Sequence, residues 1–189
     1  MSLLVLDNYD SFTYNVVHQL EQLEVDFRVF RNDKIQLDQA ANYDTFLFSP
    51  GPGLPKDAGI MPELIARFSG KKKMLGICLG MQGILEHLGC SLINMPEVLH
   101  GRSTEIRIAN HSGLFKDIPR EINVGRYHSW AVKEMPDTLK SDVMVSAFDS
   151  HNYFMAFEYP KRMQYGIQFH PESIMTEHGL QMIKNWISL

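Results

Sequence analysis

Cysteine is scarce in this sequence of 189 residues, which contains only Cys78 and Cys90. Two cysteines at this spacing match neither a paired zinc-ligand motif nor a disulfide framework, so we expect a reduced protein with no metal site. No apolar run is long enough to span a membrane, and the start MSLLVLDNYD lacks the positive segment of a secretory signal peptide. These absences predict a cytoplasmic protein that does not associate with membranes.

An excess of basic charge and the common cofactor motifs are missing as well. The 18 basic and 22 acidic residues are mixed along the chain, so no basic stripe predicts a nucleic-acid surface. The one run of like charge, Lys71-Lys72-Lys73, precedes an apolar segment and is expected to be a solvated edge. No G-x-G-x-x-G opens a helix and no Walker lysine is present, so we expect no cofactor.

The residues that are present are typical of one globular domain, which we expect to span residues 1–189. In the first half, apolar strand-like segments alternate with helical ones. Strands are expected at residues 2–7, 26–30, 45–49 and 73–77, and helices at 11–23, at 61–68 and directly after Cys78. This β-α-β order predicts an α/β fold with a mostly parallel central sheet and helices on both faces.

The second half contains shorter segments that alternate or run apolar. Strands are expected at 103–110, 121–129, 142–148, 152–159 and 163–170, in part as antiparallel hairpins. We therefore expect a small antiparallel sheet in addition to the parallel one. A last helix is expected at about 176–187, with Leu180, Ile183, Trp186 and Ile187 facing inward.

The segment GICLGMQ (76–82) places Cys78 between Gly76 and Gly80, after an apolar strand and before a helix. This is the pattern of a nucleophile elbow, in which the glycines let strand and helix approach each other. At a helix N-terminus the free amides favour the thiolate, and the amide of Leu79 is placed to stabilise an oxyanion. A lone cysteine is more often a core residue, but the two glycines favour a nucleophile. Cys90 lacks them and is expected to be structural.

The segment QFHPES supplies a candidate for proton transfer. Pro171 favours an extended backbone at His170, and in extended chain Glu172 lies on the same side as His170. The carboxylate can then orient the imidazole and support its charge. The alternative is that HPE only forms the turn that ends a strand. The presence of Cys78 in the same chain favours the catalytic interpretation.

The loop SPGPGLPKDAG (49–59) is stiff and leaves backbone amides exposed. It follows a strand, as do residues 7–11 and Cys78, so these loops are expected to surround a crevice at the carboxyl ends of parallel strands. Gly51 and Gly53 are candidates for a second oxyanion amide, with an ordinary Pro/Gly turn as the alternative. Gln82, one helical turn after Cys78, is a candidate for binding an amino-acid substrate.

The cysteine corner, the SPGPG loop and HPES together resemble the class I, or triad, glutamine amidotransferases. The resemblance runs from LLVLDNYDSFTYN (3–15) to QFHPESIMTEHG (168–179), and it implies a flavodoxin-like fold and hydrolysis of L-glutamine to glutamate and ammonia. It further implies that Cys78 forms a glutamyl thioester, that His170 acts as base and then acid, and that Glu172 orients His170. The residues that it places against glutamine or the oxyanion are Gly51, Pro52, Gly53, Leu79, Gln82, Ser129 and Trp130.

Three segments narrow the resemblance: DNYDSFTYN, HGRSTEI (100–106) and GRYHSWAV (125–132). They are similar to the small subunits of anthranilate synthase and of aminodeoxychorismate (para-aminobenzoate) synthase. The similarity implies a large chorismate-binding subunit that receives the ammonia. A chain of 189 residues that forms one domain has no room for that subunit, so we expect it to be a separate partner. The residues expected to contact that subunit are Asn8, Tyr9, Asp10, Ser11, His100, Gly101 and Ser103. Ordinary helix capping by Asp10 or Ser11 is the alternative.

Two other functions stay open at this point. A stand-alone cysteine hydrolase, such as a γ-glutamyl hydrolase, would use the same fold, but the DNYDSFTYN segment argues against it. A catalytically silent binding subunit would be free to lose a member of the Cys78, His170 and Glu172 set, and all three are present. The sequence fits either product, anthranilate or aminodeoxychorismate.

Overall fold

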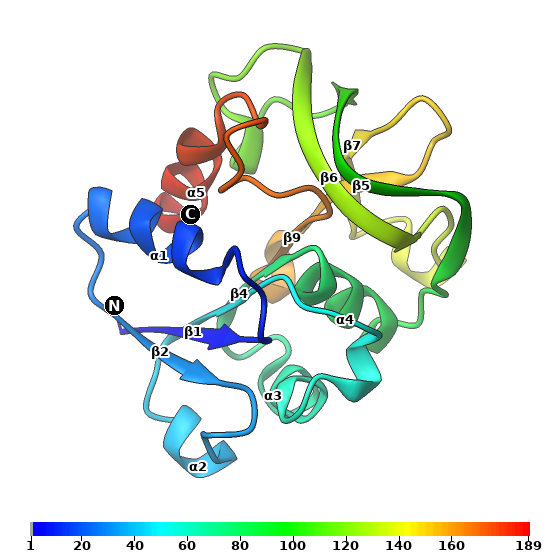
Figure 1. The fold of residues 1–189 in the computed structure, drawn as a ribbon. Coiled ribbons are helices and arrows are strands. Elements are labelled where there is room, and N and C mark those ends of the chain that lie inside the picture. The colour runs from blue at the N-terminus through cyan, green and yellow to red at the C-terminus, as the bar shows by residue number, and fades with distance from the viewer. Residues whose placement is uncertain (1) are drawn as a thin grey trace.

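The computed structural model describes residues 2–189, and in this range it contains one mixed sheet of nine strands and five α-helices (Figure 1). The strands are β1 (Leu3–Asp7), β2 (Phe27–Arg31), β3 (Thr45–Phe48), β4 (Lys73–Ile77), β5 (Ile93–Ile108), β6 (Glu121–Ala131), β7 (Met144–Phe148), β8 (Phe154–Tyr159) and β9 (Gln164–Ile167). The helices are α1 (Thr13–Gln22), α2 (Leu37–Ala40), α3 (Met61–Phe68), α4 (Leu79–His87) and α5 (Gly179–Ser188). The strand order is β2-β1-β3-β4-β9-β8-β7-β5-β6.

The first five strands in this order run parallel to one another. Because successive side chains of a strand point to opposite faces, β1 buries Leu3 and Val5 on one face and Leu4 and Leu6 on the other. Helices α1 and α5 cover the first face, and α3 and α4 cover the second (Figure 1). The predicted α/β arrangement, with helices on both faces of a parallel sheet, is confirmed.

The antiparallel strands continue the same sheet and do not stand apart from it. β8 pairs antiparallel with β9, and β7, β5 and β6 follow, each antiparallel to its neighbour. β5 begins at Ile93, ten residues before the predicted strand. Its first part contains Pro96 and pairs with β6 through two register shifts, between Asn94 and Leu99 and between His100 and Arg102.

Among the element ends that differ from the prediction, two lie next to candidate site residues. Helix α1 begins at Thr13 and not at residue 11, because the carboxylate of Asp10 accepts a hydrogen bond from the Phe12 N–H in a turn ahead of the helix. Strand β9 ends at Ile167, so His170 lies in the loop that follows and not in the strand.

The inward face of α5 differs from the prediction at its start. Leu180 is 38% exposed, so the prediction that it faces inward is wrong. The helix begins only at Gly179, and its buried face carries Met182, Ile183 and Trp186. Ile187 is half-buried against the same core.

The loops after β1, β3, β4 and β9 all leave the carboxyl ends of neighbouring parallel strands. Such ends meet at one edge of a sheet, where open α/β proteins form their ligand crevice. The fold therefore brings the DNYDSF segment, the SPGPG loop, the cysteine corner and the HPES loop to one place. Within residues 2–189, no helix has the length and apolar character needed to cross a bilayer.

Candidate active site

Cys78 lies at the corner between β4 and α4. Its backbone has φ 51° and ψ −104°, a conformation that residues other than glycine rarely adopt. A Cβ atom on Gly76 would lie 2.3 Å from the carbonyl carbon of Gly80, and one on Gly80 would lie 2.5 Å from the carbonyl oxygen of Phe48. Both glycines are therefore required for strand and helix to approach, and the corner holds the thiol at the first turn of α4.

His170 and Glu172 form a buried pair. His170 Nδ1 lies 2.7 Å from Glu172 Oε1, and the two side chains are 2% and 0% exposed. The backbone around them is fixed as well, since the His170 N–H donates to the Gly125 carbonyl (3.0 Å) and Thr176 Oγ1 donates to the His170 carbonyl (2.6 Å). His170 Nε2 has no hydrogen-bond partner among the described residues, so this nitrogen is free to exchange a proton with a substrate.

The charge of His170 depends on two neighbours. Burial by itself lowers the pKa of His170, because the imidazolium loses solvation. The interactions of the ring with Cys78 and Glu172 outweigh burial and raise its pKa to about 10. His170 is therefore protonated at neutral pH, which suits a group that must hand a proton to a leaving amine.

Cys78 and His170 line one cleft of about 490 Å³. Of the seven residues predicted to contact glutamine or the oxyanion, six line this cleft: Gly51, Pro52, Gly53, Gln82, Ser129 and Trp130. The seventh, Leu79, is 2% exposed and has its side chain in the core, so only its backbone amide is a candidate for contact with a ligand. The loops that follow the parallel strands therefore surround one cleft, as expected from the sequence.

Gly51 lies where three loops meet. A Cβ atom there would lie 2.6 Å from the Cβ of Asn8 and 2.7 Å from Cδ2 of Leu79. No larger residue fits between the loop after β1 and the cysteine corner. Gly53 lies in open space but has φ 76°, so it is required for the backbone conformation of the loop.

The amide of Gln82 is partly used within the protein. Its Nε2 donates to the Trp130 carbonyl (2.9 Å) and to Gln168 Oε1 (3.1 Å). Only Oε1 is left for a ligand, and this oxygen is suited to accept a hydrogen bond from an α-ammonium group. The predicted contact of Gln82 with an amino-acid substrate is thereby narrowed to one atom.

An aromatic layer covers His170, and no sequence pattern predicts it. The ring centroid of Tyr127 lies 4.7 Å from that of His170, and the ring centroid of Phe12 lies 5.5 Å from it. His100 packs edge-on against Tyr127 at 5.5 Å. Phe12 and Tyr127 both belong to segments that carry the family resemblance, but only the fold shows that they meet over the imidazole.

The residues predicted to contact a partner mostly surround the mouth of this cleft. Tyr9, Asp10, Ser11 and His100 line it, and Gly101 and Ser103 continue outward along β5 as exposed residues. Asn8 is a correction to the predicted set. It is 2% exposed, its side-chain amide donates to the Ser49 carbonyl, and its Oδ1 accepts from Asn32. Asn8 therefore ties the loops together and has no side-chain atoms to offer a partner.

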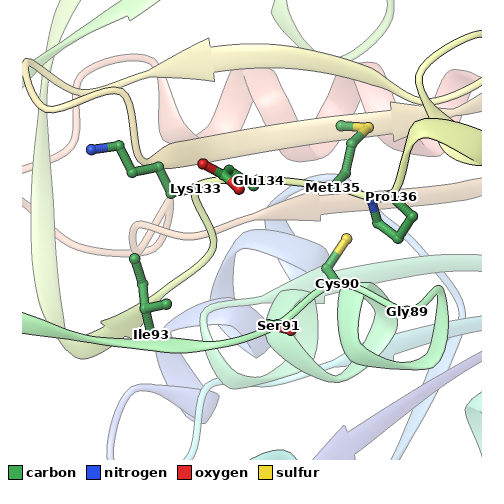
Figure 2. Close-up of a pocket in the computed structure, with 8 residues that line it drawn as sticks. All are labelled: Gly89, Cys90, Ser91, Ile93, Lys133, Glu134, Met135 and Pro136. Atoms are coloured by element: carbon green, nitrogen blue, oxygen red, sulfur yellow. The ribbon is translucent and has the colours of Figure 1, made fainter.

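Cys90 lies on a separate hollow of the surface, of about 440 Å³, between the segments 89–93 and 133–136 (Figure 2). Burial raises the pKa of the Cys90 thiol to about 11, which keeps it protonated and unreactive at neutral pH. No histidine is among the described residues that line this hollow. The contrast with Cys78 agrees with the structural role expected for Cys90.

The sequence matches the family described as glutamine amidotransferase class-I over residues 4–189. The chain belongs to the class I glutamine amidotransferases. The amidotransferase is 39% identical to the aminodeoxychorismate/anthranilate synthase component 2 of Bacillus subtilis, over 98% of this chain and 95% of that protein. It is 43% identical to the multifunctional tryptophan biosynthesis protein of Phycomyces blakesleeanus, over 100% of this chain and 25% of that protein.

The amidotransferase thus spans about a quarter of one relative and nearly all of the other. Its fold is shared with a solved structure from Thermoplasma acidophilum, which is described as part of a GMP synthase. The TM-score is 0.87 at 26% identity, and the match covers 100% of this chain and 92% of that one. Family membership and the observed fold agree with the resemblance seen in the sequence.

Proposed function

We propose that this amidotransferase hydrolyses L-glutamine at Cys78 and passes the ammonia to a separate chorismate-using synthase subunit. One observation carries the proposal: Cys78, at a strained corner after β4, shares a cleft with the buried His170–Glu172 pair. Nothing near Cys78 in the sequence requires this convergence. A thiol with a proton carrier and an orienting carboxylate is the arrangement that acyl transfer needs.

In the first step, the sulfur of Cys78 attacks the carboxamide carbon of glutamine. The negative charge that develops on the carboxamide oxygen is stabilised by the N–H of Leu79 at the start of α4 and by amides of the loop at Gly51. The C–N bond then breaks, His170 Nε2 gives its proton to the leaving nitrogen, and ammonia departs. A glutamyl thioester remains on Cys78.

In the second step, His170 accepts a proton from a water molecule as the water attacks the thioester carbon. The same backbone amides stabilise the oxyanion, and the C–S bond breaks to release glutamate. Glu172 keeps the proton of the imidazole on Nδ1, so that Nε2 exchanges protons in both steps. The α-ammonium of glutamine is bound by Gln82 Oε1 and its remaining backbone groups by the Ser129–Trp130 segment.

The names of the relatives support a chorismate-using partner. The protein from Bacillus subtilis is named for both aminodeoxychorismate and anthranilate synthases, and the one from Phycomyces blakesleeanus is named for tryptophan biosynthesis. We infer that a large synthase subunit uses the ammonia to form anthranilate, 4-amino-4-deoxychorismate or both. Capture of the tagged chain's partner from a native extract, followed by an assay for fluorescent anthranilate, separates these products.

Stimulation by the partner is the first expected result. The rim residues Ser11 and His100 adjoin the aromatic layer of Phe12 and Tyr127 over His170, so docking at the rim can act on the imidazole. We expect the isolated chain to release glutamate slowly, and the captured synthase with chorismate to accelerate it about 10-fold or more, within the usual range of coupling free energies. Equal rates with and without the synthase would contradict the coupling.

The role of Glu172 gives a second expected result. Its negative charge stabilises the imidazolium, so Glu172→Gln lowers the pKa of His170 from its raised value, and His170 loses its proton at a lower pH than in the wild type. We also expect kcat for glutamine to fall by about 10²-fold or more, because a neutral amide no longer fixes the tautomer of His170 as the carboxylate does. The pKa is measured by NMR titration of the imidazole nitrogens.

A matched control for this measurement is Glu177→Gln. Glu177 lies in the same loop but accepts from the Asn123 N–H and makes no contact with the ring in the described structure. It should leave the titration of His170 unchanged. If the pKa of His170 changes equally in Glu172→Gln and Glu177→Gln, Glu172 has no specific effect on the imidazole.

A further inference from the structure

We propose that Gln168 donates a hydrogen bond to the sulfur of Cys78, and that Gln82 holds Gln168 in the orientation that makes this possible. The inference rests on the proposed function only in treating Cys78 as the nucleophile. Gln168 follows β9 and is 0% exposed. Its Nε2 lies 3.6 Å from Cys78 Sγ, a distance suited to the large sulfur atom, and its Oε1 lies 3.1 Å from Gln82 Nε2.

The orientation of the Gln168 amide follows from a group whose hydrogen-bonding role is fixed. The backbone carbonyl of Trp130 accepts hydrogen bonds and never donates. Gln82 lies 2.9 Å from this oxygen, so the end of the Gln82 amide that faces it must be the amino group. The same amino group donates to Gln168, whose oxygen must therefore face Gln82. The amino group of Gln168 is left pointing at the sulfur.

Arg126 is a second group whose hydrogen-bonding role is fixed, and it acts through His128 on the same Trp130 carbonyl. Arg126 only donates, and its Nε lies 3.1 Å from His128 Nε2, so that nitrogen must accept. The proton of His128 is then on Nδ1, which donates to the Trp130 carbonyl at 2.9 Å. Burial, aided by the charge of Arg126, lowers the pKa of His128 to about 3, so the ring stays neutral in this role.

The chemical consequence concerns the charge on sulfur. An N–H directed at sulfur favours the thiolate over the thiol, whereas the reversed amide would place an oxygen there and disfavour it. The other groups that act on the sulfur are the His170–Glu172 pair and the amide end of α4. Gln168 thus touches the reacting atom, and Gln82 acts through Gln168 as a positioning residue.

The test uses alkylation of Cys78 by iodoacetamide, which needs neither glutamine nor a partner. In a Cys90→Ala background only one thiol is present, and the rate is followed against pH. Gln168→Met should move the midpoint of this profile upward by about one pH unit, and so slow alkylation about 10-fold at lower pH. Gln82→Met should move it in the same direction but less, because Gln168 is then free to reverse.

The two positions should not act independently. If Gln82 works through Gln168, then the double variant Gln82→Met/Gln168→Met shifts the profile no further than Gln168→Met alone. The matched control is Gln164→Met, which removes another buried glutamine of the same strand region, bonded to Ser69 Oγ at 3.0 Å. It should leave the midpoint where it is.

Two outcomes would overturn the inference. If the midpoint in Gln168→Met equals that in Gln164→Met, Gln168 does not donate a hydrogen bond to the sulfur. If the shifts caused by Gln82→Met and Gln168→Met add up in the double variant, Gln82 does not act through Gln168. If Gln168→Met does not fold, the side-chain amide signals of Gln168 in the Cys78→Ala protein serve instead. They should differ from the wild type, and unchanged signals would refute the hydrogen bond. If these shifts are observed but the wild-type chain, with and without the synthase, hydrolyses no glutamine, the proposed function alone is refuted.

Discussion

Replacing Cys78 by alanine is expected to lower glutamine-dependent product formation by the complex by about 10³-fold or more. In the proposed mechanism the sulfur becomes bonded to the glutamyl group, so a cleft without it can bind glutamine but cannot form the thioester. Removing the nucleophile of a comparable hydrolase triad costs a factor of this size or greater. Product is measured with glutamine as the only nitrogen source.

The same complex should still form product when ammonium salts replace glutamine. In the proposed division of labour the partner's reaction uses free ammonia, and the Cys78→Ala change is buried at the corner after β4. Cys90→Ala is the matched control, because Cys90 lies outside the cleft with His170 and should retain glutamine-dependent activity. Loss of activity with both nitrogen sources would show that the change disrupts the assembly and would contradict the division of labour between subunits.

Two parts of the candidate site could be predicted from the sequence because their signals are local, whereas only the fold brings these two parts together. Gly76 and Gly80 flank Cys78 within five residues, and both prove to be positions where a Cβ would collide with backbone atoms. His170 and Glu172 are two residues apart, and their contact needs only the right local backbone. The strands between the helix layers are short apolar runs, and such runs predict strands that are buried on both faces.

Other features could not be predicted because their causes lie far away in the chain. The first part of β5 has Pro96, Gly101 and mostly exposed residues, so nothing in it predicts a strand, and pairing with β6 imposes one. Asn8 resembles an exposed loop residue until Ser49 and Asn32 are seen to enclose it. Leu180 is apolar at helical spacing, yet the buried face of α5 is formed by Met182, Ile183 and Trp186, which leaves Leu180 toward solvent.

The hydrogen-bonded chain from Asp149 through Arg126 and His128 toward the cleft could not be predicted from the sequence. Arg126 and His128 lie on β6 in the GRYHSWAV segment that carries the resemblance, but nothing in that segment points to Asp149 in the turn between β7 and β8. A buried charged side chain is needed only because a partner of opposite charge lies beside it in the fold. Local sequence patterns cannot show such a partner when it is distant in the chain.

Breaking this chain at Asp149 is expected to cause the largest loss of stability. Arg126 Nη1 lies 2.8 Å from Asp149 Oδ2, and the two side chains are 3% and 2% exposed. Asp149→Asn keeps the shape but leaves a buried guanidinium facing a neutral amide. Removal of one partner from a buried pair costs about 3–5 kcal/mol of unfolding free energy, a large part of the total for a domain. Urea denaturation at neutral pH measures the difference.

Two further variants show whether the loss comes from the unpaired charge. Asp149→Asn combined with Arg126→Met removes both charges, and we expect it to recover much of the stability, because an apolar side chain needs no partner in the core. The matched control is Asp137→Asn, which breaks the pair with Lys140 on the surface, where the side chains are 92% and 64% exposed. Solvent and salt screen such a pair, so the loss of unfolding free energy there should be far smaller than in Asp149→Asn. If Asp149→Asn cost no more than Asp137→Asn, the buried pair would not be holding β6 against the turn between β7 and β8, and the support that Arg126 gives to His128 would have to come from packing alone.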